Sequence, residues 1–413
     1  MKDPAEPSLQ LRAEPLGAAF DLLAAYLPPK GVFFERRGQG VAGMGPSAIE
    51  LGTEHLDPIA VMDVLRSAAS TGGVSPVAVG AFGFLGGESR HPGLVIPRRT
   101  VRRDDRGETW RLDATSPGDD QPPPFEPVVG GVAHEPFTDM QLREVPTANA
   151  YRAAVAEAVS RIRRGELRKV VLARTIEVTA DRALDPKLLA SRLRAVNPDA
   201  YTFAVPTDDG VLVGASPELL VSRHGNEVRS NPLAGSAPRS GDAEEDRANA
   251  DALIGSPKEL EEHAIVVEAI AETLRPLCEE LTWDPEPVLR ETPNVWHLST
   301  RFRGALREPA PTALDVVAAL HPTPAVAGAP RDAALAAIEA LEPFDRGRYA
   351  GPVGWVDAEG DGEWAIALRC AELRGERAIL YAGAGIVAGS EPARELDETE
   401  RKFRAFLDAL RWG

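Results

Sequence analysis

Two pairs of glutamates, far apart in the chain, have the spacing of a possible metal site. Glu259 and Glu262 lie in one predicted helix, and Glu395 and Glu398 lie in another. A separation of three residues puts both carboxylates of a pair on one helix face. If the two faces meet, they form an all-oxygen pocket for a hard dication such as Mg²⁺. Taken alone, each pair fits a solvated helix face better, because acidic residues are common on exposed helices.

A lysine and a glutamate beside apolar strands could act as a base and an acid. Lys169 opens an otherwise apolar strand. Such a lysine usually extends its ammonium group to water, but a buried one can serve as a base. Glu218 follows Pro217 between two apolar strands. Its carboxylate either faces solvent or, against an apolar wall, acts as a general acid.

Two glycine-containing segments could present backbone N–H groups to an anion. The first contains Gly235 and Ser236, and the second runs from Gly383 through Ala384 to Gly385. Consecutive N–H groups in such turns form concave anion sites in some proteins. Most glycine turns bind nothing, so each segment is a weak signal by itself.

Three further polar residues have both an ordinary and a functional interpretation. Arg369 is a lone charge after an apolar run, where a structural ion pair and a contact with a substrate carboxylate are equally plausible. Lys402 follows Glu398 by four residues, which favours a helix-stabilising ion pair. His297 lies in an apolar segment, where histidines more often belong to the core than to a catalytic site.

Composition narrows the class of protein. The 413 residues are 43% hydrophobic and carry a formal net charge of -17. An acidic chain repels nucleic acid and anionic membranes, so we expect neither as a partner, and a small anionic substrate would need local basic residues or a metal. Cys278 and Cys370 provide neither a disulfide framework nor metal-ligand spacing. We find no apolar signal region and no bilayer-spanning run, and therefore expect a soluble, cytoplasmic protein.

The apolar patterns predict an α+β fold with a largely antiparallel sheet. The chain divides near residue 145, and residues 116–127 are expected to form a loop. Helices are expected over 151–162 (with Gly165 just beyond its end), 244–255, 258–280, 313–320, 331–340 and 391–410. Strands are expected over 77–84, 94–97, 168–178, 201–205, 211–215, 219–223, 227–230, 351–356, 364–373 and 378–384.

Taken together, nine segments resemble those of the chorismate-utilising enzymes, and among these the isochorismate synthases. They occur in family order at 169–174, 214–218, 231–236, 258–263, 295–298, 321–328, 348–351, 383–387 and 397–402. The resemblance covers about residues 145–413 and is fainter before them. It implies one large α+β domain in which two mainly antiparallel sheets pack as a sandwich flanked by helices. Residues 1–145 would be the dependent N-terminal part of that sandwich, and 146–413 the chorismate-binding catalytic region.

The resemblance also assigns the site. Mg²⁺ would be held by Glu262 and Glu398, with Glu259 and Glu395 in support, and would bind the ring carboxylate of chorismate. Contacts to the substrate would come from Gly235, Ser236, His297, Tyr349, Arg369, Gly383, Ala384, Gly385 and Lys402. Water would add at C2, activated by Lys169 as base, while Glu218 as acid protonates the hydroxyl that leaves C4.

Subfamily features favour isochorismate as the product. The ammonia-using relatives generally lack a lysine at position 169, and aminodeoxychorismate synthases carry a lysine where this chain has Ala234. We therefore expect water as nucleophile and no glutamine amidotransferase subunit; family members are mostly monomers. Salicylate synthases share the lysine but also eliminate pyruvate, and the segment 321–328 resembles the isochorismate-only type. A salicylate synthase and a non-catalytic chorismate-binding protein remain as alternatives. The sequence does not choose between menaquinone, siderophore and salicylate biosynthesis.

Overall fold

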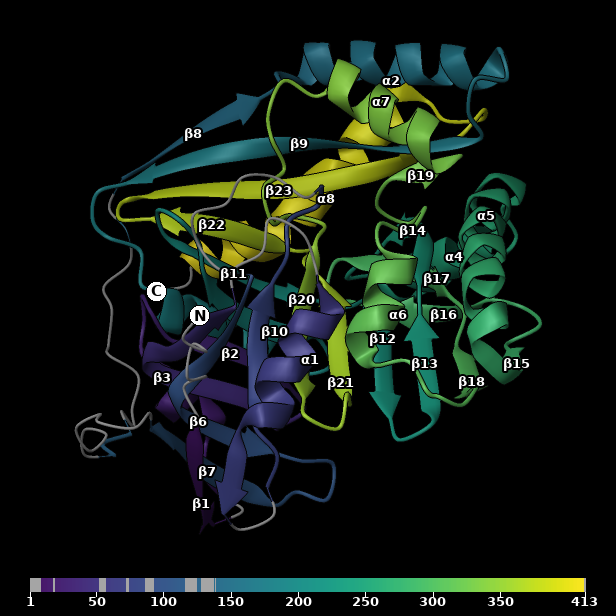
Figure 1. Ribbon diagram of the computed structural model, residues 1–413. Coiled ribbons are helices and arrows are strands. Elements are labelled where there is room, and N and C mark those ends of the chain that lie inside the picture. Colours follow the sequence, from purple (N-terminus) through teal and green to yellow (C-terminus); the bar gives the residue numbers. More distant parts are fainter. Residues whose placement is uncertain are drawn as a thin grey trace, which may run out of the picture.

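The computed structural model of the protein describes residues 9–17, 19–51, 57–71, 74–85, 93–115, 125–127, 137 and 139–411. Apart from 125–127, the loop expected over 116–127 lies outside these residues. Within them the chain forms the predicted mixture of helices and mainly antiparallel strands (Figure 1). None of the described helices is both long enough and apolar enough to cross a bilayer.

Backbone ladders join twenty of the described strands into one curled sheet. Its main path runs through β8 (Met140–Val145), β9 (Lys169–Ala180), β23 (Arg377–Ile386), β22 (Cys370–Arg374), β11 (Val211–Ser216), β10 (Tyr201–Pro206), β2 (Val32–Arg36), β3 (Gln39–Leu51), β6 (Leu94–Arg103), β5 (Val77–Ala81), β20 (Pro352–Asp357), β21 (Gly362–Ile366), β12 (Leu219–His224), β13 (Glu227–Asn231), β18 (Phe302–Leu306) and β15 (Cys278–Trp283). From β6 a branch continues through β7 (Thr109–Thr115) and β1 (Gln10–Leu16) to β4 (Ala69–Thr71), and β19 (Gly328–Ala329) pairs with β9. Only the β1–β4 pairing among these is parallel.

A second, smaller sheet lies against two helices. It consists of β14 (Leu233–Pro238), β17 (Val295–Ser299) and β16 (Val288–Glu291), all antiparallel. The helices are α1 (Pro58–Ser67), α2 (Ala148–Arg163), α3 (Pro186–Val196), α4 (Ala243–Ile254), α5 (Pro257–Leu274), α6 (Ala313–Leu320), α7 (Arg331–Leu341) and α8 (Pro392–Arg411), with short 3-10 helices at Leu22–Ala25 and Arg275–Leu277. Both α4 and α5 contact β14. The predicted α+β class is therefore confirmed, with sheets of very unequal size.

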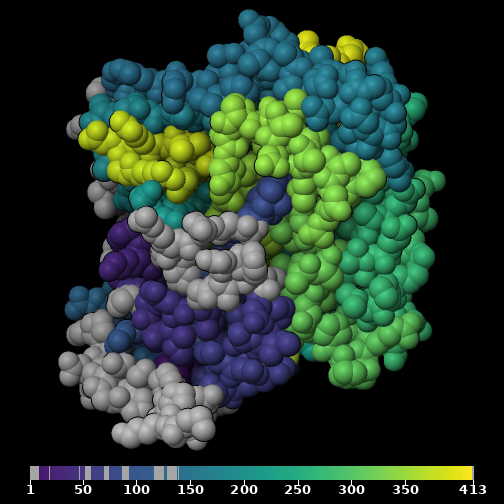
Figure 2. Space-filling view, turned by 45° about the horizontal axis from the view of Figure 1, so that its top comes forward, coloured from purple at the N-terminus to yellow at the C-terminus, as the bar shows by residue number. Residues whose placement is uncertain are grey.

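Helix α8 is fixed by apolar side chains at helical spacing. Phe403 and Phe406 are buried with Ile176 of β9 and Leu380 of β23, whereas Leu396 belongs to the other large apolar cluster. Burying each phenylalanine contributes about 2 kcal/mol. In Figure 1, α2 and α7 lie above the long strands β9 and β23, and α8 lies behind them. Figure 2 shows α2 across the top of the molecule, with the green segment that contains α7 directly beneath it. The helices thus hold β9 and β23 in place.

Several predicted bounds differ from those observed, and two of these differences have a clear backbone cause. The helix expected over 258–280 ends at Leu274, and a 3-10 turn containing Pro276 leads into β15. Proline lacks the N–H that an α-helix would need there. The strand expected over 364–373 is two strands, because the backbone at Arg369 is left-handed (φ 51°) and ends the ladder. The residues around position 369 contain no pattern that predicts such a break.

The N-terminal strands are hydrogen-bonded to strands of the C-terminal part. In this way β2 pairs with β10, and β5 pairs with β20. We therefore propose that residues 1–145 complete the domain and do not fold separately from 146–413.

Deleting residues 1–145 is expected to leave a fragment that aggregates. The deletion would expose the edges of β10 and β20, and open strand edges pair between molecules. Size-exclusion chromatography and light scattering on residues 146–413 test this, and co-expression of residues 1–145 as a separate chain should restore solubility. A monodisperse, cooperatively melting fragment would contradict the proposal.

Candidate active site

One cavity gathers most of the residues whose types suggested chemistry. Of the predicted set, it is lined by Glu218, Gly235, Ser236, Glu262, His297, Tyr349, Arg369, Gly383, Gly385, Glu398 and Lys402. Lys169 is not among the lining residues; it lies against the wall, fully buried, with Nζ 3.1 Å from Oε1 of the lining residue Glu262. Glu259 and Glu395 lie behind the lining and contact Lys258. Ala384 is also absent from the lining, since its methyl group packs in the core.

The pairing of β9 with β23 brings Lys169 close to the glycine segment 383–385. Val171 is opposite Gly385 in this ladder, one residue beyond Val170 and Ile386. A Cβ atom on Gly385 would lie 2.0 Å from Oε1 of Glu262 and 3.1 Å from Cε of Lys169. Only glycine therefore lets the α5 carboxylate and the β9 lysine approach the backbone of β23. Glycine is thus required at position 385 by the close approach of these two side chains. The sequence had suggested a different reason, namely an anion-binding turn.

Each of the four glutamates has a lysine close to it. The ammonium group of Lys258 lies 3.0 Å from Oε1 of Glu259 and 2.8 Å from Oε1 of Glu395. Lys402 Nζ lies 2.5 Å from Oε1 of Glu398, which is the expected i, i+4 ion pair. The same ammonium donates to the carbonyl oxygen of Gly383 at 2.7 Å, so Lys402 also ties α8 to β23.

The crowding of carboxylates changes their acidity. Burial, followed by the charge of Glu398, raises the pKa of Glu395 to about 7. Burial and the charge of Glu262 also raise the pKa of Glu259. Burial opposes the ionisation of Glu398 as well, but the Lys402 ammonium outweighs it, and the pKa falls to about 2. The cluster thus holds more negative charge than its lysines readily compensate.

This donor set fits Mg²⁺. Glu262 and Glu398 reach the cavity from α5 and α8, and both supply the hard oxygen ligands that the ion prefers. Within the described residues no three acidic, histidine or cysteine side chains converge as a ready-made metal cage. Magnesium is commonly held by one or two carboxylates, with waters and substrate oxygens completing its shell. A dication would also relieve the repulsion that raises the pKa values of Glu259 and Glu395.

The surroundings of Glu218 favour its protonated form. Its residue is only 3% exposed, and burial raises the pKa of the carboxyl group to about 7. A hydrogen bond from the Leu233 backbone and the charges of Lys169 and Arg369 limit the rise. The carboxyl group can therefore hold a proton near neutral pH and still release it.

His297 positions Arg369 at the cavity wall. Nη2 of Arg369 donates to Nε2 of His297 at 3.1 Å. Burial, with the charge of Arg369, lowers the pKa of His297 well below its usual value, so the ring is neutral. Because Nε2 accepts, the other ring nitrogen carries the proton and faces the Gly235 carbonyl oxygen. His297 is thus the buried, satisfied histidine of the ordinary interpretation and also lines the cavity.

Backbone strain and aromatic stacking also shape the cavity lining. Tyr349 stacks on Tyr381 with ring centroids 5.0 Å apart. Its neighbour Ala350 has φ 64°, and Arg369 has φ 51°. Left-handed backbone in non-glycine residues costs about 1–3 kcal/mol and occurs preferentially at functional sites. Both strained residues line this cavity.

Two features that shape the site were not predicted from the sequence. Lys258 belongs to the same segment as Glu259 and Glu262, so the segment itself could have indicated it. The buried ion pair between Glu342 and Arg346 had no recognisable signal. Arg346 donates to the carbonyl oxygens of Val326 and Val171, and both of these residues line the cavity.

Known proteins resemble this chain along most of its length. The sequence pattern described as chorismate binding enzyme matches residues 132–411. Isochorismate synthase DhbC of Bacillus subtilis is 42% identical over 357 residues, which are 85% of this chain and 84% of that protein. Isochorismate synthase EntC of Escherichia coli K12 is 43% identical over 272 residues, or 66% and 69% of the two chains. The structure of MenF, the menaquinone-specific isochorismate synthase of Escherichia coli, has a TM-score of 0.83 over 98% of this chain and 95% of that one; at 24% identity it supports the fold alone.

Replacing Gly385 by alanine is expected to weaken Mg²⁺ binding while the protein stays folded. The backbone of Gly385 is not left-handed, but the new methyl group would displace the carboxylate of Glu262. Loss of a group that only orients a metal ligand lowers affinity by about 10- to 100-fold, and displacement of the ligand itself is expected to lower it at least as much. Calorimetric titration with MgCl₂ measures it. Gly389→Ala is the matched control, because its Cβ would meet Lys258 Cγ at an ordinary 3.5 Å. Equal Mg²⁺ affinities of the two variants would contradict the assigned role of Glu262.

Proposed function

The chain belongs to the chorismate-binding enzyme family, and we propose that it is an isochorismate synthase, the isomerase that converts chorismate to isochorismate. Its similarity to DhbC and EntC over most of their lengths supports this function. The structural observation that carries the proposal is one cavity with Glu218 in its lining, Lys169 at its wall and a cluster of buried carboxylates beside them.

The chain's own residues provide for binding of a dianion. Arg369 and Lys402 bring two positive charges to the cavity, and Gly383 and Gly385 bring a backbone without side chains. We assign the enolpyruvyl carboxylate to Arg369 and the neighbouring backbone. When bound by Glu262 and Glu398, Mg²⁺ supplies the positive charge that holds the ring carboxylate. An acidic protein can in this way retain an acidic substrate.

The reaction needs a base on one face of the ring and an acid on the other. Lys169, as the free amine, takes a proton from the water that forms the bond to C2. Glu218, as the neutral acid, gives a proton to the hydroxyl that leaves C4 as water. The two ring double bonds move as the bond to C2 forms and the bond from C4 to its hydroxyl breaks. The substrate is therefore neither oxidised nor reduced. Proton return from Lys169 to Glu218 through solvent restores both groups.

A salicylate synthase is the nearest alternative, because it would share Lys169. Pyruvate elimination requires the cavity to hold isochorismate in a second reactive pose. The segment 321–328 favours release instead, and Ala325 and Val326 from this segment line the cavity with small apolar side chains. The products of the purified protein distinguish the two activities.

Incubation of the purified protein with chorismate and MgCl₂ is expected to yield isochorismate, and EDTA should abolish the conversion. Lys169→Ala and Glu218→Gln should each lower kcat by about 100-fold or more, because each removes a proton-transfer group. Chromatography of the products measures both effects, with the exposed Lys30→Ala as control. Salicylate and pyruvate as main products would refute the proposed function. Wild-type turnover in either site variant would refute the role of that residue.

The activity should decline above neutral pH. The carboxyl group of Glu218, with its pKa raised to about 7, must be protonated to act as an acid. As pH rises through this value the group ionises, and with Lys169 acting as the free amine throughout, kcat should fall by about tenfold per further pH unit. The measurement is kcat between pH 6 and 9. A constant kcat over this range would contradict the combination of Glu218 as the acid with Lys169 as a free-amine base.

A further inference from the structure

A second pocket, larger than the catalytic cavity, adjoins it through Pro217 and Arg369, which line both. Its walls come from the end of α3 and the following loop, from the turn between β16 and β17, and from α8. Four arginines line it, namely Arg239, Arg290, Arg369 and Arg401, whereas the only acidic side chains in the lining are Asp199 and Glu291. We call this pocket the arginine vestibule.

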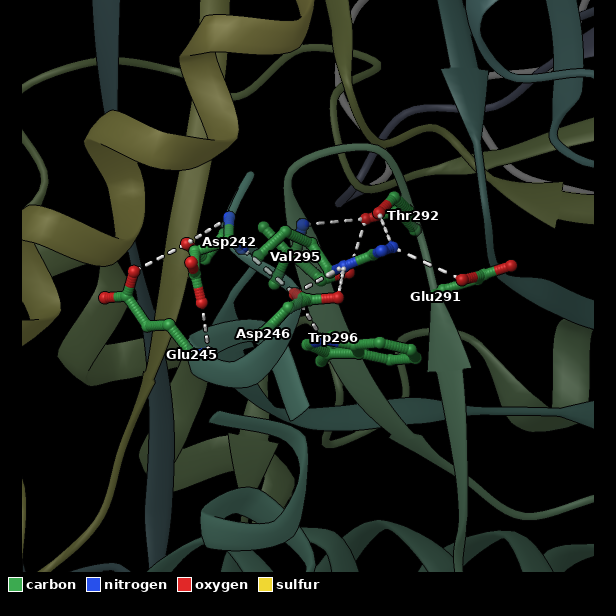
Figure 3. Close-up of polar contacts among 9 residues, drawn as sticks. Asp242, Glu245, Asp246, Glu291, Thr292, Val295 and Trp296 are labelled. Carbon is green, nitrogen blue, oxygen red and sulfur yellow. Dashed lines mark hydrogen bonds and ion pairs between the residues drawn. The ribbon is translucent and has the colours of Figure 1, made fainter. Parts of the chain in front are cut away.

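One wall of the arginine vestibule is held rigidly by polar contacts. Arg239 donates to both carboxylate oxygens of Asp246, at 2.9 and 3.1 Å, and its guanidinium lies 4.3 Å from the ring centroid of Trp296. The same side chain donates to the Thr292 carbonyl oxygen and contacts Glu291. Figure 3 shows Asp246, Trp296, Thr292 and Glu291 around this network. The positive charge of Arg239 is therefore already matched by acidic partners.

In the described part of the chain, the other three arginines of the vestibule have no acidic partner of this kind. Among the residues the structure describes, no carboxylate forms an ion pair with Arg290, Arg369 or Arg401. Arg369 contacts the neutral ring of His297. With the Asn231 amide turned so that its oxygen faces Arg290, that oxygen accepts from Nη1 at 2.9 Å. Both contacts are to uncharged groups.

Unmatched guanidinium groups in a partly enclosed pocket are costly unless an anion joins them. Burial, followed by the charge of Arg36, lowers the pKa of Arg290, and the charges of Tyr201 and Asp199 oppose this only in part. The remaining acidic residue of the pocket, Asp199, is paired with Arg37 outside it. In a chain of net charge -17, this local excess of positive charge is the reverse of the overall field.

We propose that the arginine vestibule binds small dicarboxylate anions and delivers them to the catalytic cavity through Arg369. This rests on the proposed function in one respect, since chorismate is the dicarboxylate to be delivered. Arg290 and Arg401 take the incoming carboxylates, and Arg369, which lines both spaces, receives one of them at the boundary. The vestibule thereby attracts a dianion that the rest of the surface repels.

The binding step is tested with isophthalate, an unreactive aromatic dicarboxylate, by calorimetric titration. Arg401→Gln and Arg290→Gln should each weaken isophthalate binding by about fivefold or more at low ionic strength, because each removes one unmatched charge. Arg401→Lys keeps the charge and should retain most of the affinity. Arg307→Gln, at an exposed site away from the pocket, makes the same change in net charge and should bind like the wild type. Affinities of the Arg401→Gln and Arg290→Gln variants equal to that of Arg307→Gln would overturn the proposal.

The delivery step is tested by kinetics with chorismate. Arg401→Gln should lower kcat/KM by about fivefold or more at low ionic strength and leave kcat nearly unchanged. The difference in kcat/KM between this variant and the wild type should largely vanish in about 0.5 M salt, because salt screens the attraction between the arginines and the substrate. A fall in kcat of the same size, or an effect independent of salt, would indicate a structural role and contradict delivery. If the wild-type protein does not convert chorismate, the proposed function fails, and the isophthalate titration still decides whether the vestibule binds dicarboxylates.

Discussion

The active site depends on a balance of buried charge. Four carboxylates and the amino groups of three lysines lie close together at one cavity, where each isolated ion would cost several kcal/mol. The chain has only six lysines among its 46 basic residues, and three of them belong to this cluster. Arginine could supply the charges, but it does not lose its proton in proteins, so it could not replace Lys169 as a base. The four carboxylates outnumber the three lysines. The proposed Mg²⁺ would supply the missing positive charge.

This balance requires segments that are distant in sequence to meet closely. Lys258 of α5 and Glu395 of α8 are 137 residues apart and lie within 2.8 Å. Glu262 of α5 and Glu398 of α8 line the same cavity as Val171 of β9 and Gly383 and Gly385 of β23. A continuous sheet tolerates little independent movement of its strands. The position of Lys169 relative to Gly385 is therefore fixed by backbone pairing, and not by side-chain packing alone.

Many of the elements and site residues could be predicted from the sequence, each for its own reason. The helices α2, α6 and α7 follow from apolar periodicity, and Lys169, Glu218 and the glutamate pairs follow from segments whose order matches a family. The early end of α5 was also readable, since Pro276 marks it. By contrast, the backbone break at Arg369, the bridging position of Lys258 and the neighbouring arginine pocket arise from contacts between remote segments. Local patterns carry no information about which charges lack partners after folding.

The left-handed backbone at Arg369 has a consequence for the engineering of this protein. An arginine in this conformation costs roughly 1 kcal/mol or more of conformational energy that glycine would not. Glycine at this position would relieve the strain, but it would lose the hydrogen bond to His297 and the guanidinium between the two pockets. Backbone stability gained at this position is therefore gained at the expense of the charge that joins the two spaces.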